Sequence, residues 1–326
     1  MSAFTRRLRS VSLLLVAAVL LAALLPLWLP LVAIVDLARG RTRLPTVRLL
    51  AFGLCWAWLE TAGVAVAAVL WLTGQSRNLP AHYRLQRWWA ARLMGALRIT
   101  TGITVDALEA GQLSPGPAVL LCRHASLADS LLSAWVVTSV ARMNPRYVLK
   151  RELLADPCLD IVGNRLPNHF LDRQAPDSAT ELEAVRGLAS GLGDDEVAVI
   201  FPEGTRATAT KRQKALDRIG ERDPGRAGRL AALQHLLPPR PAGSAALLDG
   251  CPRADVVVAW HVGFDGLDTF GGILRHLAHR PRPVQFHARR FARADVPSGA
   301  AFTDWLDEIW LSTDAKVHTL LTEGES

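Results

Sequence analysis

The chain has 326 residues, 50% of them hydrophobic, and a formal net charge of +7. That length holds one large α/β domain plus an appendage, and the apolar content is high for a purely soluble protein, so membrane segments are expected. The four cysteines lie far apart with no C-x-x-C pair, which excludes a disulfide framework and a cysteine zinc cluster and fits a reducing compartment.

The N-terminal region contains two long apolar stretches. Residues 11–35 carry no charge, and a helix of that length extends about 37 Å, more than the roughly 30 Å of a bilayer core. Three arginines precede it, as in a signal peptide, but no small-residue cleavage site follows and a second apolar stretch covers residues 49–72. We therefore expect the first stretch to be retained.

Arginines before, between and after these stretches define the expected topology. The positive-inside rule places all of them on the cytoplasmic side, which two full spans do not satisfy. Pro26 and Pro30 favour a bend in the first stretch, and Glu60 disfavours deep burial of the second in lipid. We predict that residues 1–78 form a membrane-embedded helical pair inserted from the cytoplasmic face of a bacterial cell membrane, with two conventional spans as the alternative.

Residues 79–326 are predicted to form a catalytic domain. Short apolar runs alternate with amphipathic stretches, which indicates an α/β fold with a mixed, largely parallel central sheet flanked by helices. A C-terminal helix from residue 298 is expected to carry Trp305, Ile309 and Trp310 on one face. Strands are expected at 118–122, 146–149, 168–171, 196–201, 256–262 and 284–291, and helices from Asp129 and over 179–192.

A long charged segment, residues 206–255, interrupts this alternation. We expect mostly solvated helix and loop there, punctuated by the PPRPAG sequence at 238–243. As an alternative, its run of lysines and arginines contacts an anionic bilayer or a phosphate-bearing donor.

Three polar clusters follow predicted strands. The first contains His124 and Asp129, the second is Asp172-Arg173, and the third is Glu203-Gly204-Thr205-Arg206. Ligands of parallel α/β sheets bind beyond the carboxyl ends of the strands, so the clusters are expected to converge on one pocket. A carboxylate beside one ring nitrogen of a histidine makes the other nitrogen a general base, as in the His–Asp half of a catalytic triad. No G-x-S-x-G accompanies the pair, so the nucleophile is expected to be a substrate hydroxyl, and Ser126 is expected to help cap the following helix.

The third cluster is the sequence Phe201-Pro-Glu-Gly-Thr-Arg206. Gly204 permits close approach of the backbone to a ligand, Thr205 offers a hydroxyl, and Arg206 presents a planar fork of donors that suits a phosphate. A charged turn after a buried strand explains the glycine but not the whole set.

In this order and spacing, the motifs resemble the phospholipid and glycerol-phosphate acyltransferase family, which includes the 1-acylglycerol-3-phosphate acyltransferases. The similarity covers roughly residues 115–265. A fourth family block, an apolar strand with a proline, is matched only loosely at 256–262, where the proline is absent and His261 is expected to be structural. The similar segments are His124-Ala-Ser-Leu-Ala-Asp129, Val148-Leu-Lys-Arg-Glu-Leu-Leu154, Phe170-Leu-Asp-Arg173, Phe201-Pro-Glu-Gly-Thr-Arg206 and His235-Leu-Leu-Pro-Pro-Arg240.

The resemblance implies a mechanism and a set of roles. His124 would deprotonate the acceptor hydroxyl, Asp129 would hold the histidine, and the hydroxyl would attack an acyl thioester directly. The acceptor's glycerol phosphate would be bound by Arg173, Glu203, Gly204, Thr205 and Arg206.

The expected reaction transfers an acyl group from acyl-CoA or an acyl carrier protein to the sn-2 hydroxyl of 1-acyl-glycerol-3-phosphate, giving phosphatidic acid. The expected partners are this lysophospholipid, the thioester donor and the membrane, with no nucleic acid, cofactor or metal. The alternatives are another lysophospholipid or a glycolipid as acceptor, hydrolysis, and a non-catalytic lipid-binding role.

Overall fold

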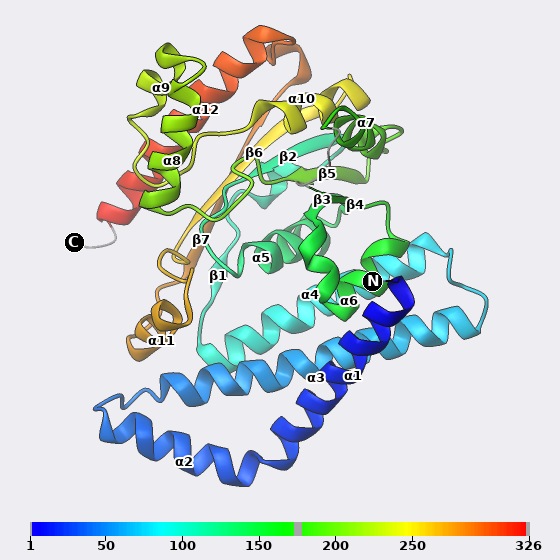
Figure 1. Cartoon of the computed structure of the whole chain (residues 1–326), viewed down its shortest axis with the longest axis vertical. Helices are drawn as coiled ribbons and strands as arrows, with labels where there is room; N and C mark the ends of the chain where they lie inside the picture. The colour runs from blue at the N-terminus through cyan, green and yellow to red at the C-terminus, as the bar shows by residue number, and fades with distance from the viewer. Residues whose placement is uncertain (1, 173–177, 324–326) are drawn as a thin grey trace.

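The computed structural model describes residues 2–172 and 178–323, which form a seven-stranded sheet between two helical layers, above a group of long N-terminal helices (Figure 1). The strand order is β1-β7-β6-β2-β5-β3-β4, with β2 at the centre. The strands are β1 (Val105–Asp106), β2 (Ala118–Cys122), β3 (Asn144–Lys150), β4 (His169–Leu171), β5 (Glu196–Ile200), β6 (Asp255–Val262) and β7 (Val284–Phe291).

The five strands from β6 to β4 in this order are parallel, and β7 pairs antiparallel with β6. This confirms the predicted mixed, largely parallel sheet. The centre of the sheet is apolar on both faces: Val119 and Leu121 of β2 pack into one core cluster, while Leu120 and Cys122 pack into the other. A strand buried on both faces reads as a continuous apolar run, and for this reason β2 is visible in the sequence.

The two faces are covered by different helices. One core cluster joins the sheet to α7 (Ser178–Ala189), α10 (Pro241–Gly250) and α12 (Ala300–Glu323), and the other joins it to α4 (Leu79–Thr101) and α5 (Asp129–Trp135). The other elements are a π-helix η2 (Val136–Val140), helices α6 (Pro157–Ile161), α8 (Ala209–Gly220), α9 (Pro224–Leu230) and α11 (Phe270–Ala278), and 3-10 turns η1 (Ala110–Leu113), η3 (Arg151–Ala155), η4 (Gly163–Arg165) and η5 (Arg293–Asp295).

The segment 206–255 is only partly the solvated region that we expected. Helix α8 has no buried residue, as predicted, but α10 buries Ser244, Ala246, Leu247 and Leu248. Pro241 occupies the first turn of α10, where its missing N–H costs no helical hydrogen bond, so the PPRPAG sequence begins a core helix.

The N-terminal helices are α1 (Ala3–Ala23), α2 (Leu25–Ala38) and α3 (Pro45–Leu72). Helices α1 and α2 are bent by 72° at Leu24, and Pro26 lies in the first turn of α2, in agreement with the predicted bend. Helix α3 is long and apolar enough to cross a bilayer, and the bent pair meets the same criterion as a unit. These helices expose many large apolar side chains, among them Leu13, Val16, Val19, Leu27, Leu31, Ile34, Val69, Trp71 and Leu72.

Two arginine clusters attach these helices to the rest of the molecule. In α1, Arg6 donates to both carboxylate oxygens of the fully buried Asp160 in α6, at 2.7 and 2.9 Å, and Arg7 donates to the same group. At the start of α3, Arg48 donates to the carbonyl of Leu277 in α11 at 3.2 Å and to carbonyls of the last turn of α4. The attachments lie at opposite ends of the N-terminal helices.

Glu60 of α3 faces protein. Its side chain is fully buried and accepts a hydrogen bond of 2.9 Å from the indole of Trp89 in α4. Helix α4, which begins after the capping residue Asn78 and ends at Gly102 with φ of 69°, packs against both α3 and α5. A division of the chain at residues 78 and 79 stays a prediction.

Candidate active site

The backbone of His124 is held on both sides by the segment that follows β5. His124 comes two residues after β2; its N–H donates to Glu203 Oε1 at 2.8 Å, and its carbonyl accepts from Ala207 N at 2.8 Å. The imidazole packs against Phe201, with ring centroids 5.0 Å apart. The first and third motifs therefore form one structural unit at the carboxyl ends of β2 and β5, as the strand-end argument predicts.

Asp129 is the acceptor around which the turn after β2 folds. Its Oδ2 accepts from His124 Nδ1 at 2.9 Å and from the backbone N–H groups of Ala125 and Ser126 at 2.6 and 2.8 Å. The Asp129 side chain is 1% exposed and that of His124 is 15% exposed. The bond to Nδ1 fixes the tautomer of the neutral ring and leaves Nε2 with its lone pair toward the cleft, as a general base requires.

Ser126 does not cap α5 in the way we expected. The helix has no side-chain cap, and the Ser126 hydroxyl instead donates to Asp129 Oδ1. This hydroxyl is fully buried and also accepts from the backbone N–H of Ala128, the residue before α5, at 3.1 Å. Burial raises the pKa of the nearby Cys122 thiol, which excludes it as a thiolate nucleophile.

A second histidine, His261 of β6, lies on the other side of Asp129. Its Nε2 is 3.0 Å from Asp129 Oδ1, at an angle outside hydrogen-bond geometry, and the residue is buried. Burial alone would raise the pKa of Asp129, but its interaction with His261 and the hydrogen bond from His124 outweigh that effect and hold the pKa well below its usual range. We expected His261 to be structural; the position of β6 beside β2 in the sheet brings its side chain to the carboxylate of Asp129.

Glu203 lies behind His124, and its side chain makes backbone contacts. It is 1% exposed and bridges two segments, accepting from His124 N at 2.8 Å and from Leu237 N at 2.9 Å. Burial raises the pKa of Glu203 to about 8, although the two backbone bonds favour its ionised form. The geometry gives Glu203 a part in positioning His124; direct binding of the acceptor stays a prediction.

The turn after Glu203 contains three further predicted ligands, Gly204, Thr205 and Arg206. Gly204 adopts φ of 71°, a left-handed conformation that favours glycine. Thr205 accepts from Lys211 Nζ at 3.3 Å, and Arg206 Nη1 donates to the carbonyl of Asp268 at 3.3 Å. Arg173 lies outside the described residues, so its predicted role stays a prediction.

A cleft of about 400 Å³ opens at His124. Gly204 and Arg206 line it, while Glu203 and Thr205 do not, and the binding of the acceptor by these residues stays a prediction. Two cations that sequence reasoning did not place here also line it: Lys150 at the end of β3 and Arg240 before α10. The position of Lys150 at the end of a strand could have predicted its place in the cleft. Arg240 lies in a segment whose path through the fold the sequence does not indicate.

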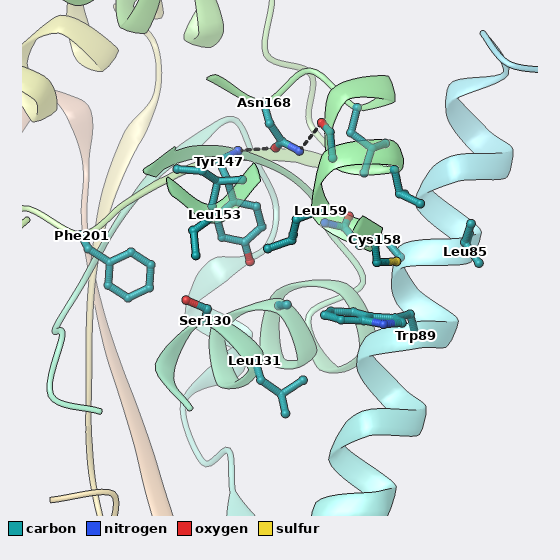
Figure 2. Close-up of a pocket in the computed structure, with 16 residues that line it drawn as sticks. Leu85, Trp89, Ser130, Leu131, Tyr147, Leu153, Cys158, Leu159, Asn168 and Phe201 are labelled. Carbon is teal, nitrogen blue, oxygen red and sulfur yellow. Dashed lines mark hydrogen bonds between the residues drawn. The ribbon is translucent and has the colours of Figure 1, made fainter. Parts of the chain in front are cut away.

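An apolar cavity of about 120 Å³ adjoins this cleft between α4, α5 and β3 (Figure 2). Ser130, Leu149, Leu153 and Phe201 line both spaces, so the two lie next to each other. Figure 2 shows Phe201 at one end of the cavity and Trp89 of α4 at the other. A chain that enters from the cleft would run toward the helix that packs against α3.

Comparison with known proteins agrees with this geometry. Residues 103–236 match the family described as Acyltransferase. The chain is similar to lysocardiolipin acyltransferase 1 of Danio rerio, with 22% identity over 248 residues, 72% of this chain and 60% of the relative. It is also similar to 2-acyl-1-lysophosphatidylinositol acyltransferase of Saccharomyces cerevisiae, with 24% identity over 254 residues, 63% of this chain and 62% of the relative. A 1-acyl-sn-glycerol-3-phosphate acyltransferase of Cocos nucifera is 27% identical over 101 residues, 31% of each chain.

The chain spans 60% and 62% of the length of the first two relatives. No solved structure matches it. The matched residues 103–236 contain β2 to β5 and both motifs that hold His124. The part of the chain that contains these motifs is therefore similar to the Acyltransferase family.

Proposed function

We propose that this protein is a lysophospholipid acyltransferase that moves an acyl group from a thioester to a free hydroxyl of a lysophospholipid. The observation that carries the proposal is the position of His124 in a cation-lined cleft next to an apolar cavity. An amphipathic acceptor matches both: its phosphate binds the cations and an acyl chain occupies the cavity. The leading acceptor is 1-acyl-glycerol-3-phosphate, acylated at sn-2 to give phosphatidic acid.

In the proposed reaction the acceptor hydroxyl donates its proton to His124 Nε2 while its oxygen attacks the thioester carbonyl carbon. The imidazolium forms beside the ionised Asp129, 2.9 Å away, which stabilises its charge. Collapse of the tetrahedral intermediate breaks the C–S bond, and the imidazolium returns the proton to the departing thiolate. The residues found at the site supply a base and its counter-charge, and the substrate supplies the nucleophile.

The apolar surface of α1, α2 and α3 supports residence in a membrane, where the acceptor is also found. We expect the protein to remain in the membrane fraction after a wash with high salt and to be released by detergent. Salt weakens contacts between exposed charges but leaves apolar burial intact. Release by salt alone would show a peripheral, electrostatic attachment and contradict the inserted helices.

The activity is tested with membranes that contain the protein, labelled acyl-CoA or acyl carrier protein, and a panel of lysophospholipids. We expect the label in a diacyl phospholipid, with phosphate-bearing acceptors used in preference to monoacylglycerol. Release of free fatty acid without transfer would favour hydrolysis, and no turnover with any acceptor would favour a lipid-binding role.

The apolar cavity is expected to select acyl-chain length. Ala134 and Leu131 both line it from α5, and Ala134 is 7% exposed. Ala134→Phe fills the space, so the preferred chain should become shorter, whereas Leu131→Ala enlarges it and should permit longer chains. Competition assays with a ladder of acyl-CoA donors and a ladder of acceptors measure the shift and reveal which chain enters the cavity. Unchanged preferences in both variants would separate the cavity from chain binding.

The match to the Acyltransferase family does not identify the headgroup of the acceptor. Two relatives are named for lysocardiolipin and lysophosphatidylinositol, which favours a second candidate: a lysophospholipid whose phosphate carries a larger headgroup. The panel separates the candidates through the ratio of kcat/KM for lysophosphatidate to that for each phosphodiester acceptor.

A further inference from the structure

The segment that ends at Arg240 is fixed by buried carboxylates. Asp314 of α12, 4% exposed, accepts hydrogen bonds from three successive backbone N–H groups, those of Gln234, His235 and Leu236, at 2.7 to 2.9 Å. Glu203 accepts the next N–H, that of Leu237, at 2.9 Å. Two carboxylates thus hold four consecutive residues, and one of the two also holds His124.

The remainder of the segment is held equally closely. Arg226 donates to the carbonyl of Pro239 at 2.9 Å and forms a bidentate ion pair with the buried Asp307 of α12. The backbone N–H of Arg240 donates to the carbonyl of Pro202 at 3.0 Å. The backbone of Arg240 is therefore held in place, next to the turn that contains Arg206.

The Arg240 side chain differs from its neighbours in exposure and partners. Leu236 to Pro239 are buried, whereas Arg240 is exposed and lines the cleft. Within residues 2–172 and 178–323, its guanidinium makes neither an ion pair nor a side-chain hydrogen bond. Lys150 and Arg206 line the same cleft, and no carboxylate is found among the described residues that line it. The guanidinium groups of Arg206 and Arg240 and the ammonium of Lys150 are all cationic, which favours a negatively charged ligand at this cleft.

We propose that Arg240 is a phosphate-binding residue that gives the cleft a second phosphate position, in addition to the one at Arg206. Arg206 already offers its donors to one phosphate group. The guanidinium of Arg240, carried by a fixed backbone, suits a second phosphate group, because its fork of donors binds phosphate oxygens in a bidentate manner. This inference rests on the proposed acyl transfer and specifies the substrate class.

Two substrates could supply the second phosphate: an acceptor whose headgroup carries two phosphates, or the diphosphate of acyl-CoA. The variants are Arg240→Ala and Arg240→Lys, with Arg218→Ala as the matched control, since Arg218 is an exposed arginine of α8 outside the cleft. The acceptors are a lysophosphatidate and lysocardiolipin; the donors are acyl-CoA and acyl-pantetheine, which lacks the phosphates.

For Arg240→Ala we expect KM to rise at least about tenfold for the substrate that supplies the second phosphate, with kcat within about threefold of wild type, since hydrogen bonds to charged groups are worth this much. A rise for lysocardiolipin alone assigns the position to the acceptor, and a rise for acyl-CoA but not acyl-pantetheine assigns it to the donor. Arg240→Lys should recover part of the loss, because it restores the charge without the fork. Arg218→Ala should match wild type.

Equal KM values for Arg240→Ala and Arg218→Ala with every substrate would overturn the proposal. Binding of inorganic pyrophosphate, measured by calorimetry on the full chain in detergent, tests it independently of turnover. If the wild-type protein transfers no acyl group, the proposed function fails, but weaker pyrophosphate binding by Arg240→Ala than by Arg218→Ala would still support the phosphate position. Equal pyrophosphate affinity of these two variants would sink it whether or not the protein is active.

Discussion

His124→Ala is expected to lower kcat for acyl transfer by roughly 10²- to 10⁴-fold, the range that general bases contribute. The loss is expected because the substitution removes Nε2 of His124. This is the ring nitrogen that the bond between Nδ1 and Asp129 leaves able to accept a proton. Stability should change little, because the imidazole is partly exposed and the hydrogen bonds of His124 to the FPEGTR segment and Ala207 are made by its backbone. Initial rates with saturating donor and acceptor measure the effect.

The control for this substitution is His279→Ala, which removes an exposed histidine that does not line the cleft. It should leave kcat and membrane retention unchanged. A His124→Ala protein that is folded, membrane-bound and active within tenfold of wild type would show that His124 is not the general base.

Asp129→Asn is expected to cause a loss of similar size, roughly 10²- to 10⁴-fold in kcat, with KM little changed. Three donors converge on Oδ2, so the asparagine oxygen should take that position and keep the bond to His124. The amide then faces the Ser126 hydroxyl, which can rotate to accept. The substitution therefore preserves the geometry and removes the negative charge that stabilises the imidazolium.

The melting temperature of Asp129→Asn in detergent tests this interpretation. It should stay close to that of wild type, whereas Asp129→Ala leaves two backbone N–H groups without their acceptor, at a cost of about 1–3 kcal/mol each, and should unfold at a clearly lower temperature. Asp129→Asn activity within tenfold of wild type, in a stable protein, would mean that the charge of the carboxylate contributes nothing to the reaction.

Features of the site that depend on a short stretch of chain could be predicted from the sequence. The run AVLLC followed by His124, and the run EVAVI followed by FPEGTR, each place polar residues at the end of a strand that is buried on both faces. Because parallel strands present their carboxyl ends at one edge, the convergence of the motifs followed from general rules.

Features that depend on distant segments could not be predicted. From the sequence, Glu203 is expected to bind a ligand at the surface. The structure shows instead that its buried carboxylate joins the backbone of His124 to that of Leu237, 34 residues further along the chain. Arg240 follows two prolines that are typical of a loop, and its place in the cleft depends on carboxylates of α12 that hold the preceding residues. His261 looked like one more strand residue until the order of strands placed β6 beside β2.

The two arginine clusters at the ends of the N-terminal helices constrain how the molecule can move. A body held at one point can rotate in any direction about it, whereas a body held at two separated points can turn only about the line that joins them. The packing of α3 against α4 opposes that remaining rotation. Arg6 and Arg7 on Asp160 form one point, and Arg48 on the ends of α4 and α11 forms the other. In the proposed membrane-inserted state, these attachments would fix the height and tilt of the cleft relative to the bilayer, and each acceptor lipid would reach His124 in one orientation.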